Sequence, residues 1–395
     1  MSNLDEFLNR IKRDEIIQLS KQLIKTPSVT GDEKNIILLA KKMLEERGLK
    51  VNLHGSENRP VLTSYTSLDD KDQLVFNGHL DTVPTASLDA WSTPPFDPQL
   101  HGNELRGRGS VDMKASCAVM IHTLGILEEL KLPISVGVHL VPDEEKGAAY
   151  GTRVLIDEIK KGELRKPNYV VIGEKSNLKL RIAERGGFSF KVKFEGRATH
   201  TAYARTEGIN AITKAAKGVL ALEKPIDKWH PWIGSPVLSV NAINAGTVGN
   251  QVPDECIMSI DRRLIPGETP ETVMEEVKEA LDIAGKDDPE WIWKIITNRD
   301  SDGNIIWSPS NYTDIDTDLG KAFQKAVKLA LNKEPELFVE WAGGTDGAQY
   351  RRLGIQTIGF GPSGEHMHGP NELVYVDSLI DEAKVYLTLA KILSE

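Results

Sequence analysis

The sequence predicts an α/β protein in which a mostly parallel sheet is flanked by helices and a smaller α+β domain is inserted. Short apolar runs alternate along the chain with segments of helical periodicity, which is typical of parallel strands joined by helices. From residue 187 to about 297 the pattern changes, because apolar and polar residues alternate strictly, as they do in half-exposed strands. The length of 395 residues also exceeds that of one ordinary domain.

The first part of the larger domain is expected to span residues 1–186 and to open with two helices. Apolar residues recur at helical spacing over residues 11–24. Thr30 and Glu33 form a capping-box pattern that starts the second helix, and Gly48 suits its end. The elements expected next are a helix at residues 115–130 and strands at residues 74–76, 134–140 and 169–172.

The inserted domain is expected to span residues 187–297, and residues 298–395 return to the larger domain. The chain shows neither internal repeats nor a low-complexity segment, so two domains account for the sequence. The insert is expected to contain strands at residues 188–194, 237–243 and 256–260 and helices at residues 209–222 and 270–284. The final part is expected to contain a helix at residues 319–331 and a strand at residues 357–360.

The composition excludes several classes of function. The formal net charge is −10 and no cluster of Lys and Arg is sustained, so a nucleic-acid partner is not expected. No run approaches 18 uninterrupted apolar residues and the first residues are polar, so neither a membrane span nor a signal peptide is expected. Cys117 and Cys256 are the only cysteines, which favours a reducing, cytoplasmic compartment and excludes a cysteine-ligated metal cluster.

Acidic residues and histidines follow the ends of the expected strands. In an open α/β sheet, ligands bind in the crevice outside the carboxyl ends of the strands. Asp112 also lies in a glycine-rich turn directly before an expected helix. We therefore expect these side chains to share one site, although they are distant in the sequence. The residues that follow the strands are His79, Asp81, Asp143, Glu144, Glu145, Glu174, His366 and His368.

Each of these residues alone has an ordinary interpretation, because a single histidine or a pair of glutamates is most often a solvated surface group. Several carboxylates and imidazoles in one cleft, however, would repel one another or lose solvation unless a cation neutralised them. Mixed imidazole and carboxylate ligands favour Zn²⁺, one ion or two, with Co²⁺ or Mn²⁺ as alternatives. In this interpretation His79 binds metal, and Asp81 accepts the other ring N–H and fixes the tautomer.

Five motifs occur in order along the chain: GHLDTVP, GRGSVDMK, VPDEEKG, VIGEKSN and HGPNE. Together they resemble the motifs of the co-catalytic zinc metallopeptidase and deacylase family, which includes acetylornithine deacetylase, succinyl-diaminopimelate desuccinylase, aminoacylase and related carboxypeptidases and dipeptidases. One motif alone would be weak, but the ordered set is specific and the resemblance covers residues 10 to 390. It implies a zinc-exopeptidase-like catalytic domain and a dinuclear metal-dependent hydrolase that cleaves a C–N amide bond.

The resemblance also implies roles for individual residues. Asp112 would bridge two metal ions, Glu144 would act as the general base and Asp81 would orient a ligand histidine. His366 competes with His368 as a ligand, but only His368 fits the HxPNE pattern, so His366 is expected on the surface. The implied metal ligands are His79, Asp112 and Glu174 for one ion, and Asp112, Glu145 and His368 for the other.

The insert resembles the smaller domain of this family, which often dimerises, so a homodimer is expected. His200, in GRATHTAYARTEGINAI, matches a histidine that in several members reaches the active site of a neighbouring subunit and assists catalysis. The match is imperfect, because the usual proline after this histidine is missing and Gly208 comes one residue late. The reach of His200 therefore remains open.

Four further residues match positions that contact substrate in the family. Asn250 and Arg263 lie in NQVPDECIMSIDRRLIPGET, where the adjacent Arg262 is an alternative to Arg263. Gly344 and Thr345 lie in GGTDGAQY, which resembles a glycine-rich substrate loop, although a plain tight turn is an almost equal alternative. An arginine in such a site would bind a substrate carboxylate through its planar fork.

The expected function is removal of an acetyl or succinyl group from an N-acyl amino acid, as in acetylornithine deacetylase and succinyl-diaminopimelate desuccinylase. The alternative is a dipeptidase or carboxypeptidase with the same dinuclear site, because fold and metal do not separate these activities. A metal-binding protein without catalysis is disfavoured, since the ligand set and Glu144 are both present. Nucleotide binding is also disfavoured, because GFGPSG lacks the GxGxxG spacing and the P-loop lysine.

Overall fold

The computed structural model describes residues 2–66, 73–300, 302–339 and 343–395. The chain divides into two units, and the second continues beyond residue 297 because Ile305 and Trp307 pack against its core. The assignment of the second unit as a lid and dimerisation domain stays a prediction. The first unit comprises Met1–Ile182, Tyr312–Phe338 and Thr345–Glu395, and the second comprises Ala183–Asn311 and Val339–Gly344.

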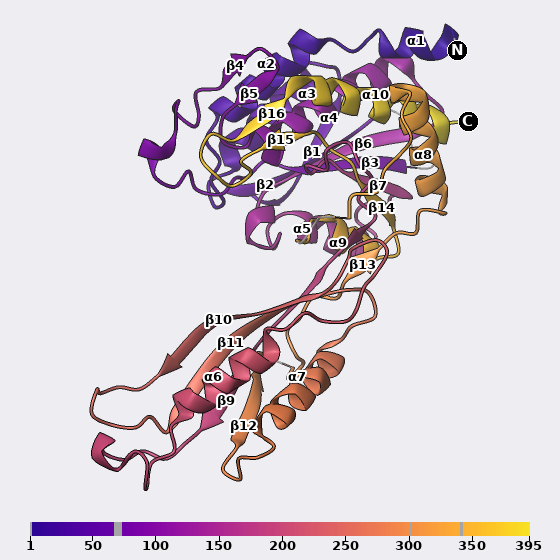
Figure 1. Cartoon of the computed structure of the whole chain (residues 1–395). Helices are drawn as coiled ribbons and strands as arrows, with labels where there is room; N and C mark the ends of the chain where they lie inside the picture. Colours follow the sequence, from indigo (N-terminus) through magenta and orange to yellow (C-terminus); the bar gives the residue numbers. More distant parts are fainter. Residues whose placement is uncertain (1, 67–72, 301, 340–342) are drawn as a thin grey trace. The chain divides into compact units, whose positions relative to one another are not determined.

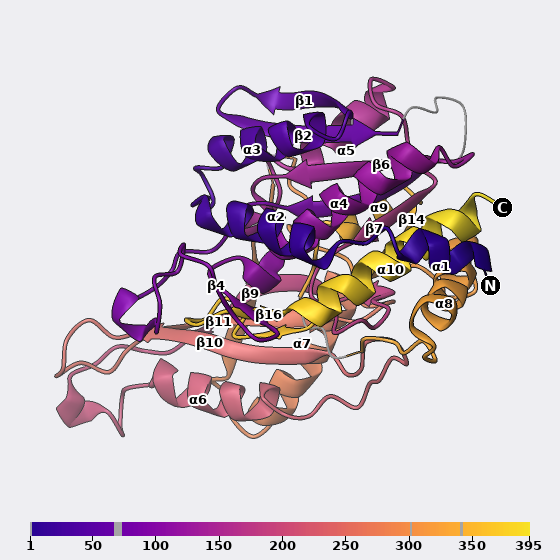
Figure 2. The ribbon, with the colours of Figure 1, turned by 90° about the horizontal axis from the view of Figure 1, so that it is seen from above.

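A six-stranded sheet forms the centre of the first unit (Figure 2). Its inner strands β6, β3, β7 and β14 pair in parallel, and β1 and β2 add an antiparallel edge. This arrangement confirms the predicted α/β class with parallel strands. In spatial order the strands are β1 (Lys50–Ser56), β2 (Arg59–Tyr65), β6 (Ser135–Val141), β3 (Gln73–His79), β7 (Tyr169–Ile172) and β14 (Gln356–Gly359).

Helices cover both faces of this sheet (Figure 1). Successive residues of a strand point to opposite faces, so Phe76 stacks on Tyr386 of α10 while Val75 packs beside Ile156 of α5 and Tyr350 of α9. One face carries α1 (Ser2–Leu8), α2 (Arg13–Lys25), α3 (Lys34–Glu45), α4 (Ala115–Leu130), α8 (Asp318–Leu331) and α10 (Val376–Leu393). The other face carries α5 (Thr152–Lys161) and α9 (Gly347–Arg351).

The stretch Ser110–Leu130 is long and apolar enough to cross a membrane by length and composition alone. It consists of a short irregular turn, η2 (Ser110–Lys114), and helix α4. Its most apolar part is buried entirely inside the first unit, between the sheet and the helices α2 and α10. Enclosure by protein on all sides accounts for this composition, because a core helix needs no polar face.

A small second sheet in the first unit joins two segments that are far apart in the sequence. Its order is β15-β16-β5-β4, and Leu373 of β16 lies opposite Arg106 of β5. This pairing places the segment after β5 beside the segment before β16. The four strands are β4 (Gln99–His101), β5 (Glu104–Arg106), β15 (Gly364–Glu365) and β16 (Leu373–Tyr375).

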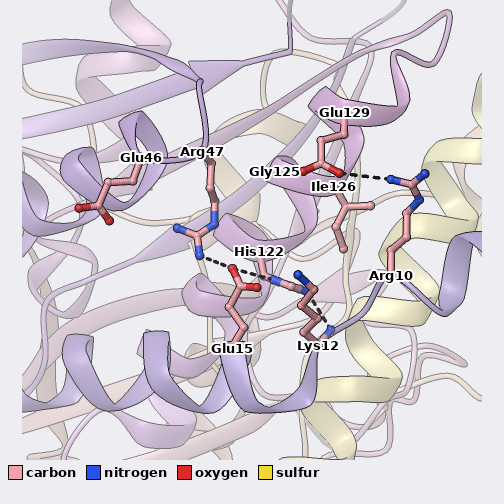
Figure 3. Close-up of a pocket in the computed structure, with 9 residues that line it drawn as sticks. All are labelled: Arg10, Lys12, Glu15, Glu46, Arg47, His122, Gly125, Ile126 and Glu129. Carbon is pink, nitrogen blue, oxygen red and sulfur yellow. Dashed lines mark hydrogen bonds and ion pairs between the residues drawn. The ribbon is translucent and has the colours of Figure 1, made fainter.

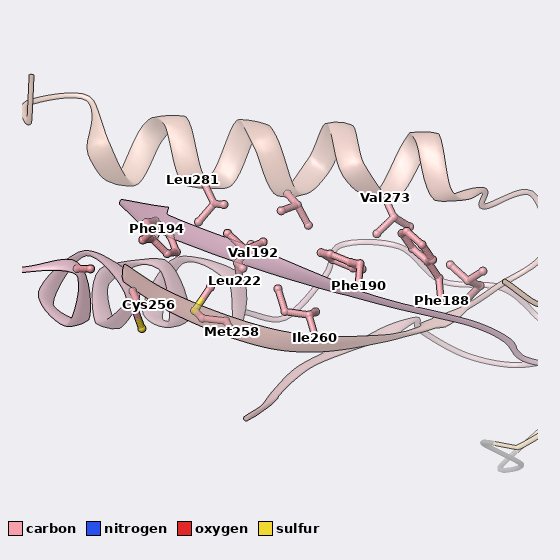
Figure 4. Close-up of a cluster of buried hydrophobic side chains, with 14 residues drawn as sticks. Phe188, Phe190, Val192, Phe194, Leu222, Cys256, Met258, Ile260, Val273 and Leu281 are labelled. Atoms are coloured by element: carbon pink, nitrogen blue, oxygen red, sulfur yellow. The ribbon is translucent and has the colours of Figure 1, made fainter. Parts of the chain in front are cut away.

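The second unit has one antiparallel sheet of order β10-β11-β9-β12. Phe188, Phe190, Val192 and Phe194 alternate along β9 and point toward α7, as Figure 4 shows. Helices α6 (Ala211–Leu222) and α7 (Pro270–Gly285) pack against this core. The strands are β9 (Gly186–Glu195), β10 (Val237–Ala245), β11 (Glu255–Leu264) and β12 (Ile292–Thr297).

The remaining elements are short. Three are single helical turns and two are strands of two residues near the boundaries of the units. They are η1 (Leu88–Ala90), η3 (Glu144–Lys146), η4 (Thr201–Tyr203), β8 (Ala183–Glu184) and β13 (Asn311–Tyr312).

The predicted capping box at the start of the second helix is wrong. Helix α3 begins at Lys34, and the Thr30 hydroxyl donates instead to a carboxylate oxygen of Asp81, 2.8 Å away. The Glu33 carboxylate accepts from the Gly31 backbone N–H at 2.7 Å and from the guanidinium of Arg59. Thr30 therefore binds Asp81, and Glu33 binds Gly31 and Arg59, so neither side chain caps the helix in the predicted way.

Candidate metal centre

The parallel strands bring the acidic and imidazole side chains to one edge of the sheet. Strand β3 ends at His79, and it lies between β6 and β7. Glu144 and Glu145 follow the end of β6 in the turn η3, and Glu174 follows the end of β7. Because neighbouring parallel strands end at the same edge, these three strand ends form one cluster.

Asp112 lies at the centre of this cluster. Its Oδ1 is 3.0 Å from Nε2 of His79, and its Oδ2 is 2.8 Å from Nε2 of His368. Glu174 Oε1 is also 3.0 Å from the same His79 nitrogen, and Glu145 Oε2 is 3.2 Å from the same His368 nitrogen. Each oxygen of Asp112 thus faces a different imidazole, each accompanied by a glutamate, which is the arrangement that a carboxylate bridging two ions requires.

The donor set fits divalent cations. Ligand atoms of His79, Asp112 and Glu145 lie within 4.8 Å of one another, as do those of His79, Glu144 and Glu174. Asp112 and Glu174 are buried, and Oε2 of Glu174 has no hydrogen-bond partner among the residues that the structure describes. Several buried carboxylates so close together repel one another, and a nearby positive charge is needed to keep them ionised.

The pKa shifts of the cluster have the same origin. Burial opposes protonation of His79, but the Glu174 charge and the hydrogen bond with Asp112 hold its pKa well above the ordinary value. Hydrogen bonds with Asp112 and Glu145 raise the pKa of His368 to about 10. Burial opposes ionisation of Asp112, yet its bonds to both imidazoles hold its pKa below the ordinary range. In the metal-free protein, the protons on His79 and His368 therefore supply positive charge to the carboxylates, and bound metal ions would take their place.

Asp81 connects a ligand to the turn that carries Glu144. The Nδ1 atom of His79 is 3.0 Å from the Asp81 carbonyl oxygen and 3.4 Å from its carboxylate. The same carboxylate accepts hydrogen bonds from the backbone N–H groups of Glu144 at 3.1 Å and Glu145 at 3.3 Å. One carboxylate thus fixes both the imidazole ring and the η3 turn.

Glu144 has the environment of a proton acceptor. Burial raises the pKa of its carboxyl well above the ordinary value, and the charges of Glu174 and Asp346 raise it further, against the opposing charge of His79. Asp143, the residue before it, has a left-handed backbone with φ of 69°. The Asp143 carboxylate accepts from Arg59 at 2.8 Å and from the Tyr150 N–H at 3.0 Å. These bonds hold the turn in its strained conformation.

The sequence matches a known family of hydrolases along most of its length. Residues 75–392 match the family described as Peptidase family M20/M25/M40. The chain belongs to this family. The predicted resemblance and the predicted class of enzyme, a metal-dependent hydrolase, are therefore confirmed.

Similar proteins match this chain along nearly its whole length. A succinyl-diaminopimelate desuccinylase from Polynucleobacter necessarius is 28% identical over 388 residues, which are 94% of this chain and 97% of the relative. Aminopeptidase PepT from Bacillus cereus has a similar structure, with a TM-score of 0.77 at 18% identity and coverage of 98% and 100%. The YXEP protein of Bacillus subtilis, described as a dinuclear metal-binding peptidase of the M20 family, has a TM-score of 0.69 at 18% identity and coverage of 98% of both chains.

His366, the alternative to His368, was expected on the surface, whereas His200 and Asn250, which were expected in the site, belong to the second unit. His366 is 55% exposed, and its ring is 3.8 Å from the adjacent Glu365. His200 is exposed in the second unit, and its Nδ1 accepts from the Ala202 N–H. The Asn250 carbonyl accepts from the Thr201 N–H at 3.0 Å, which places Asn250 beside His200. Catalytic and substrate roles for His200 and Asn250 stay predictions.

The structure distinguishes the two adjacent arginines. Arg262 is buried and pairs with Glu268 and Glu276, so its charge is engaged within the second unit. Arg263 is half-exposed and pairs with Asp261 at 2.8 Å. Arg263 is therefore the more accessible of the two arginines, and its contact with substrate stays a prediction.

The glycine-rich segment before α9 contains a carboxylate that the sequence analysis did not select. Gly344 is exposed and Thr345 is buried, with its hydroxyl accepting from the Gly347 N–H at 3.1 Å. Asp346 is also buried, and burial raises its pKa to about 7. Its electrostatic interactions with His79 and Glu174 indicate that it lies near the metal cluster. The GGTDG motif is the sequence signal for Asp346, because it places a carboxylate directly after the predicted substrate residues Gly344 and Thr345.

A pocket of the first unit is lined by residues that do not belong to the metal cluster (Figure 3). Its volume is about 450 Å³, and charged side chains line much of it. Arg47 pairs with Glu15, Arg10 pairs with Glu129 at 3.2 Å, and the Lys12 N–H donates to Nε2 of the buried His122. The two ion pairs neutralise each other's charges, and the acidic and basic side chains that line the pocket are equal in number, so the pocket has no net charge that would select a ligand.

Proposed function

We propose that this chain is a dinuclear metal-dependent amidohydrolase that removes a succinyl group from an N-succinyl amino acid. The position of Asp112, with one oxygen against His79 and the other against His368, carries the dinuclear part of the proposal. Relatives named succinyl-diaminopimelate desuccinylase, which match along 94% of the chain, support the acyl group and the diaminopimelate substrate. Removal of an acetyl group, as from acetylornithine, uses the same chemistry.

In this proposal His79, Asp112 and Glu174 hold one ion, and Asp112, Glu145 and His368 hold the other. When bound, two divalent cations would polarise the amide carbonyl and lower the pKa of water. Mixed nitrogen and oxygen donors favour Zn²⁺, with Co²⁺ or Mn²⁺ as alternatives. Asp81 keeps the His79 ring in the tautomer that leaves Nε2 free to bind an ion.

Glu144 is the general base and acid of the proposed reaction. Its raised pKa suits a group that accepts a proton from the attacking water and returns it to the leaving nitrogen. Arg263 binds a substrate carboxylate through its guanidinium, and Asn250, Gly344 and Thr345 contribute to substrate binding. His200 stabilises the oxyanion, and its place in the second unit is compatible with action in the same subunit or across a dimer.

Surface features of the second unit support a homodimer. Strand β10 is an edge strand with mostly exposed side chains, and such an edge can pair with another chain. Helix α6 exposes Leu220 to 74% and Ile212 to 44%. A cytoplasmic location, which the two unpaired thiols favour, belongs to the same proposal.

The alternative is a peptidase that uses the same site. Similar structures include an aminopeptidase, a tripeptidase and a metallo-carboxypeptidase, all at 20% identity or less, a level that establishes the fold alone. Cleavage of a dipeptide or of a C-terminal residue would need the same ligands and the same base, so the site residues would keep their roles.

The test is release of free amine from a small set of substrates, with and without added Zn²⁺ or Co²⁺. The set contains N-succinyl-diaminopimelate, N-acetylornithine, two N-acetyl amino acids and two dipeptides. We expect metal-dependent release mainly from N-succinyl-diaminopimelate. Release mainly from dipeptides would transfer the protein to the peptidase alternative, and undiminished release after chelation would refute the metal-dependent proposal altogether.

A further inference from the structure

A buried ion pair lies directly behind the proposed metal ligands. Nη1 of Arg108 donates to Oε2 of Glu372 at 2.8 Å, and both side chains are 1% exposed. The small sheet brings them together, because β5 ends at Arg106 and pairs with β16, which begins at Leu373. Neither residue belongs to the proposed ligand set. A buried ion pair often adds little to stability, because desolvation of the two charges offsets their attraction, so a role in stability alone does not explain this pair.

The Glu372 carboxylate organises the loop that carries Asp112. Its Oε1 accepts from the backbone N–H groups of Val111 at 2.9 Å and of Asp112 itself at 3.1 Å. Its Oε2 accepts from the Gly109 N–H at 2.9 Å in addition to Arg108. Four donors converge on this one carboxylate, so it fixes the backbone position from which Asp112 extends.

The Arg108 guanidinium extends the same connection to two other segments. Its Nη2 donates to the backbone carbonyl of His368 at 3.2 Å and to that of Pro84 at 3.3 Å. Pro84 follows the segment of His79 and Asp81 in the chain. Through Arg108, Glu372 is thus connected to the backbones of three segments that carry proposed ligands.

We infer that Arg108 and Glu372 are positioning residues that set the distance between Asp112 and His368, and hence the affinity for the second metal ion. His368 depends on such support, because its side chain is 50% exposed and its backbone is left-handed, with φ of 63°. His79 and Glu174 are buried at the ends of central strands and have support of their own. The inference rests on the ligand set of the proposed function.

The test measures metal binding rather than turnover. Metal-free wild-type protein and the Glu372→Gln variant are titrated with Zn²⁺ in a calorimeter, and bound metal is counted after gel filtration. We expect the wild type to bind two ions, and Glu372→Gln to bind the ion of His368 about 10–100-fold more weakly, as is typical when a group that supports a ligand is changed. The ion of His79 and Glu174 should be weakened much less, because only its shared ligand Asp112 lies on the altered loop. Glutamine keeps the shape of the side chain but loses its charge.

Two further variants keep the test decisive. The double variant Arg108→Gln/Glu372→Gln removes the pair without leaving an unpaired buried charge, and it should show the same selective loss. Glu268→Gln is the matched control, because Glu268 is also a buried partner of an arginine and accepts a backbone N–H, but it lies in the second unit. It should lower the melting temperature and leave both Zn²⁺ affinities unchanged.

The possible failures are distinguishable. Wild-type affinities for both ions in Glu372→Gln and in the double variant would overturn the inference and leave the ligand set intact. Equal weakening of both ions in these variants would also overturn it, because it would show a general structural role. A wild-type protein that binds no Zn²⁺ would overturn both the inference and the proposed function.

Discussion

Among single residues, Glu144 separates metal binding from catalysis most clearly. It lies beside the ligands but is assigned a proton-transfer role. We expect Glu144→Gln to bind two equivalents of metal and to lose about 10²–10⁴-fold in kcat, since general acid–base catalysis contributes about this factor. Metal analysis and steady-state kinetics on the same sample provide the measurement. Loss of metal from this variant would show that Glu144 is a ligand rather than the base.

The imidazoles make the metal-free protein sensitive to pH. His368 has a pKa raised to about 10 from an ordinary value of 6.5, and the pKa of His79 is also raised. Between these pH values the folded chain binds more protons than the unfolded chain, so its stability falls as the pH rises. The raised pKa of Glu144 acts in the same direction, whereas burial lowers the pKa of Lys114 to about 7 and opposes part of this trend.

We therefore expect the Tm of the chelated protein to fall between pH 6.5 and about 10, while its affinity for Zn²⁺ rises because bound protons must leave. Differential scanning fluorimetry and Zn²⁺ titration at four pH values give both quantities. A Tm that increases over this range would contradict the assigned shifts.

At the scale of elements, charged contacts hold the turn that carries the base. Arg59 of β2 bridges the buried Glu33 and Asp143, and its guanidinium lies over the Tyr150 ring. We expect Arg59→Ala to cost about 3 kcal/mol of unfolding free energy, because it leaves buried carboxylates without a partner. Urea unfolding measures this loss, and Lys34→Ala is the control.

Lys34 forms an exposed ion pair with Glu57 at the start of α3, near Glu33 in the sequence. Its removal should change the stability little, since exposed ion pairs contribute little. Similar losses in Arg59→Ala and Lys34→Ala would contradict the assigned role of Arg59.

The local sequence pattern predicts some helices and strands correctly and misses others. The expected strand at 169–172 and the expected helix at 115–130 coincide with β7 and α4, because an apolar run or a long helical period identifies a buried element. No element was assigned to 50–56, where β1 is an edge strand with mostly exposed side chains and hence no clear alternation. Helix α10 was not assigned either, although Asp377, Asp381 and Lys384 recur at helical spacing on its less buried side.

At the scale of the whole molecule, the proposed homodimer through the second unit makes a testable prediction. We expect wild-type protein to sediment as a dimer and Leu220→Glu to sediment as a monomer, because a charge at an apolar contact opposes association. Leu329→Glu is the matched control, since Leu329 is 51% exposed on α8 of the first unit. Analytical ultracentrifugation measures the masses. Equal behaviour of the two variants would contradict dimerisation through α6.

The order of motifs was enough to name the residues that the sheet brings together around Asp112, because each follows a recognisable strand. The supporting residues could not be found in this way. Arg108 meets Glu372 only after two short strands pair, and Arg59 meets Asp143 only through the sheet. Such contacts join distant segments, and no local spacing in the sequence records them.

The most direct test of the central claim is hydrolysis of N-succinyl-diaminopimelate as a function of Zn²⁺ added to metal-free protein. The account predicts that turnover rises with added metal and reaches its maximum at two equivalents per chain, and that Asp112→Ala remains inactive at every metal concentration. Full turnover in the chelated wild type, or wild-type turnover by Asp112→Ala, would contradict a dinuclear site bridged by Asp112.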